Sequence, residues 1–392
     1  MQYTLTPAHV HAHAARLLQQ HLRLTGFRSR CPAALLLDLL LFAACWLTSL
    51  FATCLRLARA PSPETARLAL HHWLPDPGEL ERRLNRALAA DLPRALRRRQ
   101  QRLAIDLTLV PYHGRPLADP NEVYRSKARH GTSHFHAYAT AYLVLRGQRF
   151  TVALTAVERS ERLEGVLRRL LRRCAQVGIR PRLLLLDRGF CSVGVIRYLQ
   201  AARYPFLLPL PLRGRKADHP QGPSGSRVFG YRRRSGWGSY TLTADSGRAA
   251  TVSVCVKCRN RRGERSQRGR QALVYGYWGL QPRCWDWVRQ AYRARFGIEA
   301  SYRQLQQARA RTSSREPSWR LLLVGLGLVL RNVWVWLHYA VLSRPRRGGR
   351  VLQLGRLRLK TLLAWLAQVA QARYGTCDQT GSDRPIPMDV RN

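Results

Sequence analysis

Residues 287–315 place a single carboxylate, Glu299, among seven arginines. Residues three and four positions apart are neighbours on a helix. If the stretch is helical, the side that carries Glu299 also carries Tyr292, Arg295, Tyr302, Arg303 and Gln306. A guanidinium makes paired, charge-assisted hydrogen bonds with a phosphate, whereas a carboxylate binds divalent metal ions through oxygen. The stretch therefore combines the two kinds of side chain that chemistry on a phosphate needs.

Two aspartates upstream lie in or directly after predicted strands. Asp106 alternates with the apolar residues Ile105 and Leu107 in a short strand, which ends at a Pro-Tyr-His-Gly turn. Asp187 follows four leucines, which predict a buried central strand, and the carboxyl ends of such strands are where open α/β sheets place their chemistry. Aspartate is depleted in strands. Each of the two therefore calls for a partner or a metal ion.

Asp106, Asp187 and Glu299 are far apart in the sequence. Two strands of one sheet, with a helix packed beside them, would bring the three carboxylates together. Such a cluster is unstable through like-charge repulsion unless cations are bound, and Mg²⁺ would relieve the repulsion. Taken alone, these residues predict a basic, metal-dependent nuclease.

The spacing of Tyr292, Arg295 and Glu299 resembles the Tyr-x2-Arg-x3-Glu-x6-Lys signature of bacterial and archaeal insertion-sequence transposases. The glutamate of that signature is the third member of an Asp-Asp-Glu metal site. The sequences that begin at Asp106 and Asp187 resemble the first and second catalytic motifs of one branch, first described from halobacterial insertion sequences. Gln306 departs from the signature, because a neutral amide stands where the family has lysine.

The resemblance implies a DNA transposase that cleaves strands at insertion-sequence ends and transfers them to target DNA. It implies that Asp106, Asp187 and Glu299 are both catalytic residues and ligands of two Mg²⁺ ions, for which Mn²⁺ could substitute. One ion would activate water and later a DNA 3′-hydroxyl, and the other would stabilise the leaving oxygen. The implied DNA contacts are Tyr292, Arg295, Arg188, Arg303 and Gln306. The implied partners are the terminal inverted repeats, the target DNA and a second copy of the chain in a synaptic complex.

The composition agrees with a nucleic-acid partner. The 392 residues include 67 Lys+Arg and 22 Asp+Glu, for a formal net charge of +45, and such a charge repels itself unless a polyanion is present. An apolar content of 46% supports a packed core and excludes a disordered chain. Nine scattered cysteines, with no recognisable secretory signal, favour reduced thiols in a prokaryotic cytoplasm, where we expect association with the nucleoid.

The fold class expected between residues 101 and 210 is α/β. The pattern predicts strand, hairpin with a turn at residues 146–148, helix over 158–177, strand, helix and strand. This is the order of an RNase H-like fold, in which a mixed five-stranded sheet has three antiparallel strands followed by parallel ones.

We expect four regions along the chain. Residues 1–100 form an all-α N-terminal DNA-binding domain. A helix-turn-helix and a purely structural helical bundle fit its pattern equally well. Residues 101–210 and 288–343 form the RNase H-like catalytic core. Residues 211–287 form a β-rich insertion, with β-like runs at 227–231, 239–243, 251–256 and 271–277. Residues 344–392 form a basic C-terminal tail.

Two alternatives remain open from the sequence. Residues 33–55 and 319–342 are apolar enough to be mistaken for membrane spans. The first run has arginines on both flanks and a break at Thr48-Ser49, and the second has Arg331 at its centre, so buried helices and no membrane are the better interpretation. The other alternative is a catalytically inactive relic that only binds DNA, and Gln306 is the feature that supports it.

Overall fold

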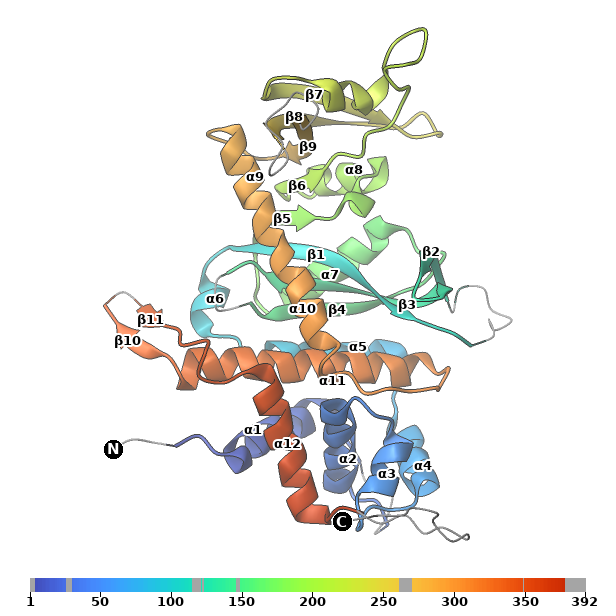
Figure 1. Cartoon of the computed structure of the whole chain (residues 1–392), viewed down its shortest axis with the longest axis vertical. Helices are drawn as coiled ribbons and strands as arrows, with labels where there is room; N and C mark the ends of the chain where they lie inside the picture. Colours follow the sequence, from blue (N-terminus) through green and yellow to red (C-terminus); the bar gives the residue numbers. More distant parts are fainter. Residues whose placement is uncertain are drawn as a thin grey trace, which may run out of the picture. The chain divides into compact units, whose positions relative to one another are not determined.

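The computed structural model describes residues 4–25, 30–114, 121, 123–145, 149–260, 270–347 and 349–377. The chain folds into two compact units (Figure 1). The helical unit contains residues 1–87, 304–334 and 354–392. The sheet unit contains residues 88–303 and 335–353. Both units are discontinuous in sequence.

The core of the sheet unit is one mixed sheet with the order β2-β3-β1-β5-β6-β9-β8-β7, in which β4 also pairs with β3. Its central strands are β1 (Gln101–Pro111), β3 (Thr132–Leu143), β4 (Thr151–Val157), β5 (Pro181–Leu186) and β6 (Phe206–Pro209). β3 is antiparallel to β1 and β4, whereas β5 is parallel to β1 and β6. The predicted RNase H-like order of strands is confirmed, and the predicted turn at residues 146–148 lies outside the described residues.

Within the described residues the sheet has nine strands instead of the predicted five. The additional strands are β2 (Tyr124–Arg129), β7 (Gly236–Thr243), β8 (Ala249–Asn260) and β9 (Arg270–Trp278). β7, β8 and β9 pair antiparallel in sequence order, and β9 then pairs antiparallel with β6. The β-rich insertion is therefore a continuation of the core sheet, because β6 offers a free edge on which β9 adds.

The strand predicted at residues 227–231 is wrong. Gly225–Tyr231 forms a 3-10 helix, η2. Gly225 has a φ of 60°, a left-handed conformation that turns the chain before a strand can form. The buried hydroxyl of Ser226 donates a hydrogen bond to the carbonyl of Pro211 at 2.6 Å, which fixes the tight turn.

Helices cover both faces of the central sheet. Ala139 pairs with Thr155 and Thr140 pairs with Leu154, so Thr140 and Thr155 point to opposite faces. Thr155 accepts a hydrogen bond from Arg169 of α7 (Leu163–Gln176), whereas Thr140 shares one with Tyr302 of α10 (Gly297–Leu305). α7 is the helix predicted over residues 158–177, and its apolar side is buried at Val166, Leu167, Leu170, Leu171 and Cys174. The other helices of this unit are α6 (Arg94–Arg98), α8 (Val193–Ala201) and α9 (Trp285–Arg293).

The predicted continuous helix after residue 287 is interrupted. Ala294–Phe296 forms a 3-10 turn between α9 and α10, and its tighter hydrogen bonding is visible in the bond from the amide of Gly297 to the carbonyl of Ala294. The backbone stays in the right-handed helical region through the turn. Tyr292 therefore lies on α9, whereas Glu299, Tyr302 and Arg303 lie on α10. Gln306 is the residue after α10 ends, and its side chain is exposed.

The helical unit is built from α1 (Pro7–Leu22), α2 (Ala33–Trp46), α3 (Leu50–Arg56), α4 (Pro63–Trp73), α5 (Pro77–Ala90), α11 (Pro317–Trp336) and α12 (Leu359–Tyr374). The sequence Ser62-Pro63-Glu64 favours a helix start, and α4 begins there. Ser62 is its N-cap and accepts a hydrogen bond from the amide of Thr65, with Pro63 at the first position and Glu64 in the first turn. A short hairpin, β10 (Arg344–Arg346) and β11 (Gly349–Val351), belongs to the sheet unit.

The two long apolar segments fold as helices. Residues 33–55 are divided between α2 and α3, which are bent by 101° at the predicted break. Among the described residues, Pro317–Val341 is long and apolar enough to cross a membrane by composition, and the bent pair is a second candidate if it counts as one span. The apolar window of Pro317–Val341 is 89% buried inside the fold, and Arg331 within it donates a hydrogen bond to Gln304 at 2.9 Å. These features are those of a buried core helix.

A buried carboxylate ties the C-terminal helix to the N-terminal ones. Asp38 of α2 is 2% exposed and accepts hydrogen bonds from His11 of α1 (2.7 Å), Arg373 of α12 (2.6 Å) and Tyr374 (2.8 Å). Burial alone would raise the pKa of Asp38, but the bonds from His11 and Tyr374 and the charge of Arg373 lower it below its usual value. The apolar helix α2 tolerates an aspartate because three donors satisfy it.

Candidate active site

The strand register brings the two predicted aspartates to one edge of the sheet. Ile105 of β1 pairs with Leu186 of β5 in parallel, so Asp106 and Asp187 are the next residues of two adjacent strands. The side chain of Asp106 is 17% exposed and accepts a hydrogen bond from the amide of Leu107 at 2.8 Å. The side chain of Asp187 is 43% exposed and stands just before the 3-10 helix Arg188–Phe190.

The third carboxylate comes from α10. Glu299 lies in the first turn of this helix, where the helix dipole favours a negative charge, and its side chain is 49% exposed. Tyr302, one turn later, donates a hydrogen bond to the backbone carbonyl of Asp106 at 2.9 Å and shares another with Thr140 at 2.8 Å. Tyr302 therefore fixes α10 against β1 and sets the position of Glu299 relative to Asp106.

Arg295 lies at the centre of the three carboxylates. Its Nη1 is 2.8 Å from Oδ2 of Asp106, and its Nη2 is 3.4 Å from Oδ1 of Asp187 and 3.5 Å from Oε1 of Glu299. Arg295 is 5% exposed, and its guanidinium carbon is 5.6 Å from the ring centre of Tyr292. A single buried cation thus contacts all three acidic residues that the sequence predicted to converge.

The charges of this cluster are incompletely balanced. Burial raises the pKa of Asp106 to about 6; the nearby guanidinium of Arg295 opposes this rise, and the negative charge of Asp187 adds to it. Burial alone would lower the pKa of Arg295, but its interactions with Tyr292, Asp106 and Asp187 raise it above the usual value. The site is therefore short of positive charge, and an additional cation would be stabilised there.

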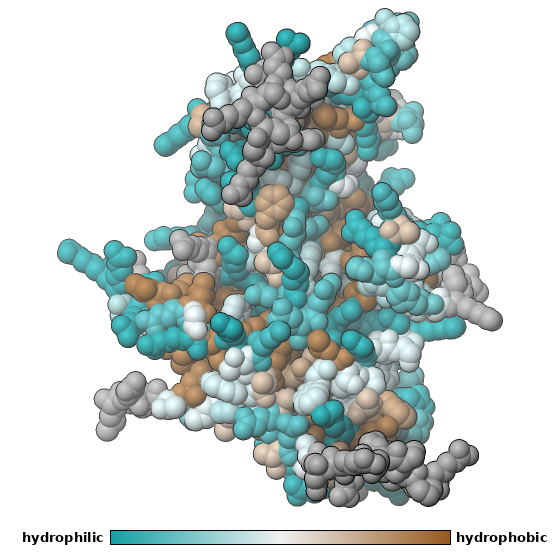
Figure 2. Space-filling view, in the orientation of Figure 1, coloured by the Kyte–Doolittle hydropathy of each residue, from teal (hydrophilic) through white to brown (hydrophobic). Residues whose placement is uncertain are grey.

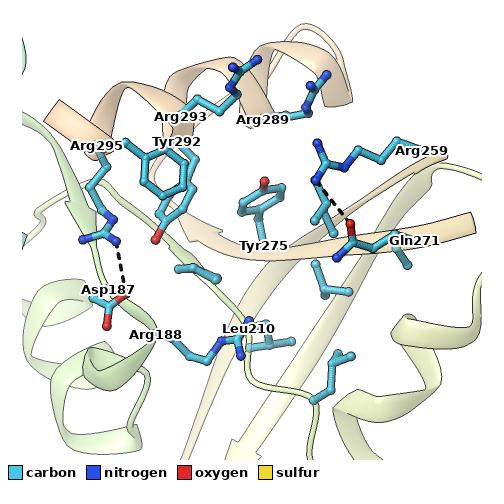
Figure 3. A pocket seen from close by; sticks show the side chains of 16 residues that line it. Asp187, Arg188, Leu210, Arg259, Gln271, Tyr275, Arg289, Tyr292, Arg293 and Arg295 are labelled. Atoms are coloured by element: carbon cyan, nitrogen blue, oxygen red, sulfur yellow. Dashed lines mark hydrogen bonds and ion pairs between the residues drawn. The ribbon is translucent and has the colours of Figure 1, made fainter. Parts of the chain in front are cut away.

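A pocket of about 700 Å³ opens beside the cluster (Figure 3). Asp187 and Arg295 lie at one end of it, where their ion pair is drawn. Tyr292 and Tyr275 line its middle, and Arg259 with Gln271 lies at the far end. The arginines that line it are Arg188, Arg259, Arg289, Arg293 and Arg295. Five guanidinium groups beside aromatic rings suit a ligand that is both anionic and planar.

The remaining predicted contact residues are distributed unevenly. Arg188 and Tyr292 line the pocket. Arg303 is exposed on α10 in the same unit. Gln306 belongs to the helical unit, so it is not part of the cluster described here.

Several residues of the site were not predicted. The pocket arginines Arg259, Arg289 and Arg293, and Tyr275 beside them, come from the insertion and from α9, and no sequence spacing connects them with Asp187. Tyr302 was placed on the same helix side as Glu299, and that spacing was the one signal available for its role.

The donor set suits a hard divalent cation, since all three side chains offer carboxylate oxygens and Asp187 and Glu299 are about half exposed. In the arrangement observed, however, no group of three or more His, Cys, Asp or Glu residues in the described parts of the chain is close enough to hold a metal ion. The guanidinium of Arg295 lies between the carboxylates instead. The residues therefore fit a metal ion chemically, provided that Arg295 moves aside.

Comparisons with known proteins identify the family and the fold. The family model described as transposase DDE domain matches residues 97–324, which include Asp106, Asp187 and Glu299. The fold is similar to that of piggyBac transposase in a cryo-EM structure of its synaptic complex with hairpin DNA, with a TM-score of 0.53 at 9% sequence identity, over 93% of this chain and 78% of that chain. No curated protein matches the sequence. Members of this family generally use divalent metal ions. Because the family model covers more than half of its length, the chain belongs to the family of transposases with a DDE domain.

Proposed function

We propose that this protein is a DNA transposase that cleaves strands at the ends of an insertion sequence and transfers them into target DNA. The observation that carries the proposal is the convergence of Asp106, Asp187 and Glu299 on one cation, beside a pocket lined by five arginines. Packing alone would not bring three carboxylates together, because their like charges repel one another.

In this proposal Asp106, Asp187 and Glu299 hold two Mg²⁺ ions, which Mn²⁺ could replace. The bound ions would supply Lewis-acid stabilisation of the attacking and leaving oxygens during in-line displacement at phosphorus. The carboxylates fix where that chemistry occurs, and Tyr302 keeps the backbone of Asp106 and the helix of Glu299 in register. No covalent link between protein and DNA is required.

Binding of the DNA strand would depend on the arginines. Arg188 and Arg295, together with Tyr292, line the pocket next to Asp187, and each guanidinium can make two parallel hydrogen bonds to a phosphate. Arg303 and Gln306 would contact DNA farther along, where Gln306 supplies a hydrogen bond without a charge. Hydrophilic side chains alternate with apolar patches on the face drawn in Figure 2. The net charge of +45 favours contact with a polyanion over a wide area.

The partners follow from the reaction. The substrates would be double-stranded terminal inverted repeats and target DNA, and pairing two ends favours a homodimer. We place the protein in the cytoplasm of a prokaryote, associated with the nucleoid and without a membrane role, and in the branch first described from halobacterial insertion sequences.

The test is cleavage of DNA that carries the terminal repeats of the element, with Mg²⁺ or Mn²⁺ present. We expect end-specific nicking by the intact chain and none by Glu299→Gln. Glu164→Gln is the matched control, because it makes the same change on α7, which covers the opposite face of the sheet; this variant should cleave normally. Nicking that persists in Glu299→Gln would contradict the proposed site.

A second candidate is a catalytically inactive relic that binds element ends. Gln306 favours it, since this residue replaces the lysine of the family signature. The relic predicts salt-sensitive DNA binding with no cleavage by the intact chain under any divalent metal. The same assay therefore separates the two functions.

A further inference from the structure

Arg295 fills the space that a metal ion would need. Mg²⁺ binds its oxygen ligands at about 2.1 Å, which would draw carboxylate oxygens to within roughly 3 Å of one another. A guanidinium is larger and planar, and here it contacts Asp106 through Nη1 and both Asp187 and Glu299 through Nη2, at 2.8 to 3.5 Å. Arg295 therefore acts as an internal counter-ion that holds the carboxylates near one another but too far apart for a metal.

The other side of Arg295 faces the pocket. Its Nε is buried and has no hydrogen-bond partner among the described residues. The pocket that it lines contains four further arginines and one carboxylate, that of Asp187. Figure 3 shows Arg295 at one end of the pocket, paired with Asp187. An anion that entered the pocket could therefore reach the guanidinium of Arg295.

We propose that Arg295 is an exchangeable counter-ion: DNA phosphate entering the pocket draws its guanidinium away from Asp106, Asp187 and Glu299, and divalent cations then take its place. The inference rests on the proposed function for the identity of the anion. Charge is compensated at each step of the exchange. The guanidinium moves from the three carboxylates to a phosphate, and divalent cations then supply the positive charge beside the carboxylates. Metal binding without DNA is disfavoured by this arrangement, which keeps the metal-dependent site closed until substrate arrives.

The consequence is thermodynamic coupling. If phosphate binding removes Arg295 from the carboxylates, then DNA raises the affinity for the metal, and the metal must raise the affinity for DNA by the same factor. A coupling of about tenfold or more is within the usual range for two linked sites.

The experiment measures free Mn²⁺ by electron paramagnetic resonance during titration of the full chain, with and without a 20-base-pair duplex of arbitrary sequence. For the intact chain we expect weak Mn²⁺ binding alone and at least about tenfold tighter binding with the duplex. Arg295→Gln should bind Mn²⁺ at least about tenfold more tightly without DNA and should gain little when the duplex is added.

Two further variants make the result specific. Arg293→Gln removes the same charge from the same pocket, but Arg293 is exposed and makes no ion pair with the three carboxylates among the described contacts. It should leave Mn²⁺ affinity without DNA unchanged. Arg295→Lys keeps a charge but cannot span three carboxylates, so it should bind Mn²⁺ more tightly than the intact chain; it decides the question if Arg295→Gln does not fold.

The inference is overturned if Arg295→Gln, or Arg295→Lys in its place, binds Mn²⁺ without DNA no more tightly than Arg293→Gln. The exchange is also overturned if the intact chain binds the duplex and gains no affinity for Mn²⁺. A chain that does not bind the duplex at all would count against the proposed function, and the measurements without DNA would still decide the role of Arg295.

Discussion

Two regions of the molecule surround carboxylates with arginine and tyrosine, with opposite results. In the helical unit, the single carboxylate of Asp38 accepts hydrogen bonds from three side chains, those of His11, Arg373 and Tyr374, and its pKa is lowered. In the sheet unit, three carboxylates share the one guanidinium of Arg295, and the pKa of Asp106 is raised to about 6. A satisfied carboxylate holds helices together, whereas an under-neutralised cluster is ready to bind a cation. The ratio of donors to carboxylates distinguishes the structural Asp38 from the candidate active site.

The largest expected effect is the loss of DNA cleavage when a carboxylate of the cluster of Asp106, Asp187 and Glu299 is removed. Asp187→Asn should lower end-specific cleavage by a factor of about 10³ or more, corresponding to about 4 kcal/mol of transition-state stabilisation. Stability should not fall, because the change removes a charge that repels Asp106. The measurements are the cleavage rate at saturating Mn²⁺ and the thermal midpoint without metal. Unchanged cleavage would remove Asp187 from the site.

The next largest effect should be a loss of stability when the carboxylate of Asp38 is removed. Asp38→Asn leaves the buried His11 and the half-exposed Arg373 without their charged partner, and breaking a buried pair such as His11–Asp38 costs about 3 kcal/mol. Denaturant unfolding measures the loss. Cleavage at a temperature where the variant stays folded should equal that of the intact chain, and a specific loss of cleavage there would break the distinction between the two clusters.

The pH dependence of stability should have opposite signs at the two clusters. The pKa of Asp106 is raised on folding, so the folded state binds more protons than the unfolded state, and in EDTA its contribution to stability is lost as the pH rises from about 4 to about 6. The pKa of Asp38 is lowered, so its contribution is lost as the pH falls through the folded-state pKa. Thermal midpoints between pH 3 and pH 7 report both. Asp106→Asn should remove the decline from pH 4 to pH 6, and a decline that persists in this variant would show that another group causes it.

The smallest effect distinguishes two tyrosines. Tyr302→Phe loses the hydrogen bonds to Thr140 and to the carbonyl of Asp106, and Tyr374→Phe loses the one to Asp38. Each should cost about 1 kcal/mol of stability. We expect only Tyr302→Phe to slow cleavage as well, since Tyr302 positions β1 against α10. Equal cleavage by the two variants would contradict that positioning role.

Part of this site could be predicted from the sequence. Four leucines before Asp187 indicated a buried strand, and alternation around Asp106 indicated another, so their placement on one sheet edge followed from the strand order. The helical spacing of Arg295 and Glu299 was also readable. The strands that Arg295 faces could not be predicted from the sequence, because they depend on the 3-10 turn at Ala294–Phe296 and on the packing of α10 against β1.

Long-range partners account for most of what the sequence did not reveal. Asp38 was visible only as an anomaly in an apolar run, and the partners that explain it, Arg373 and Tyr374, are more than 330 residues away. The insertion was recognised as β-rich from its short runs. Its fusion with the core sheet through β6 and β9 required the edge of β6 to be free, and no local pattern carries that information.

The most direct test of the account is the location of Mn²⁺ by anomalous diffraction in crystals of the full chain grown with Mn²⁺ and a DNA duplex. The account predicts Mn²⁺ bound by Asp106, Asp187 and Glu299, with Arg295 turned into the pocket and bonded to a phosphate. Mn²⁺ found elsewhere, with Arg295 still between the three carboxylates in the presence of bound DNA, would contradict it.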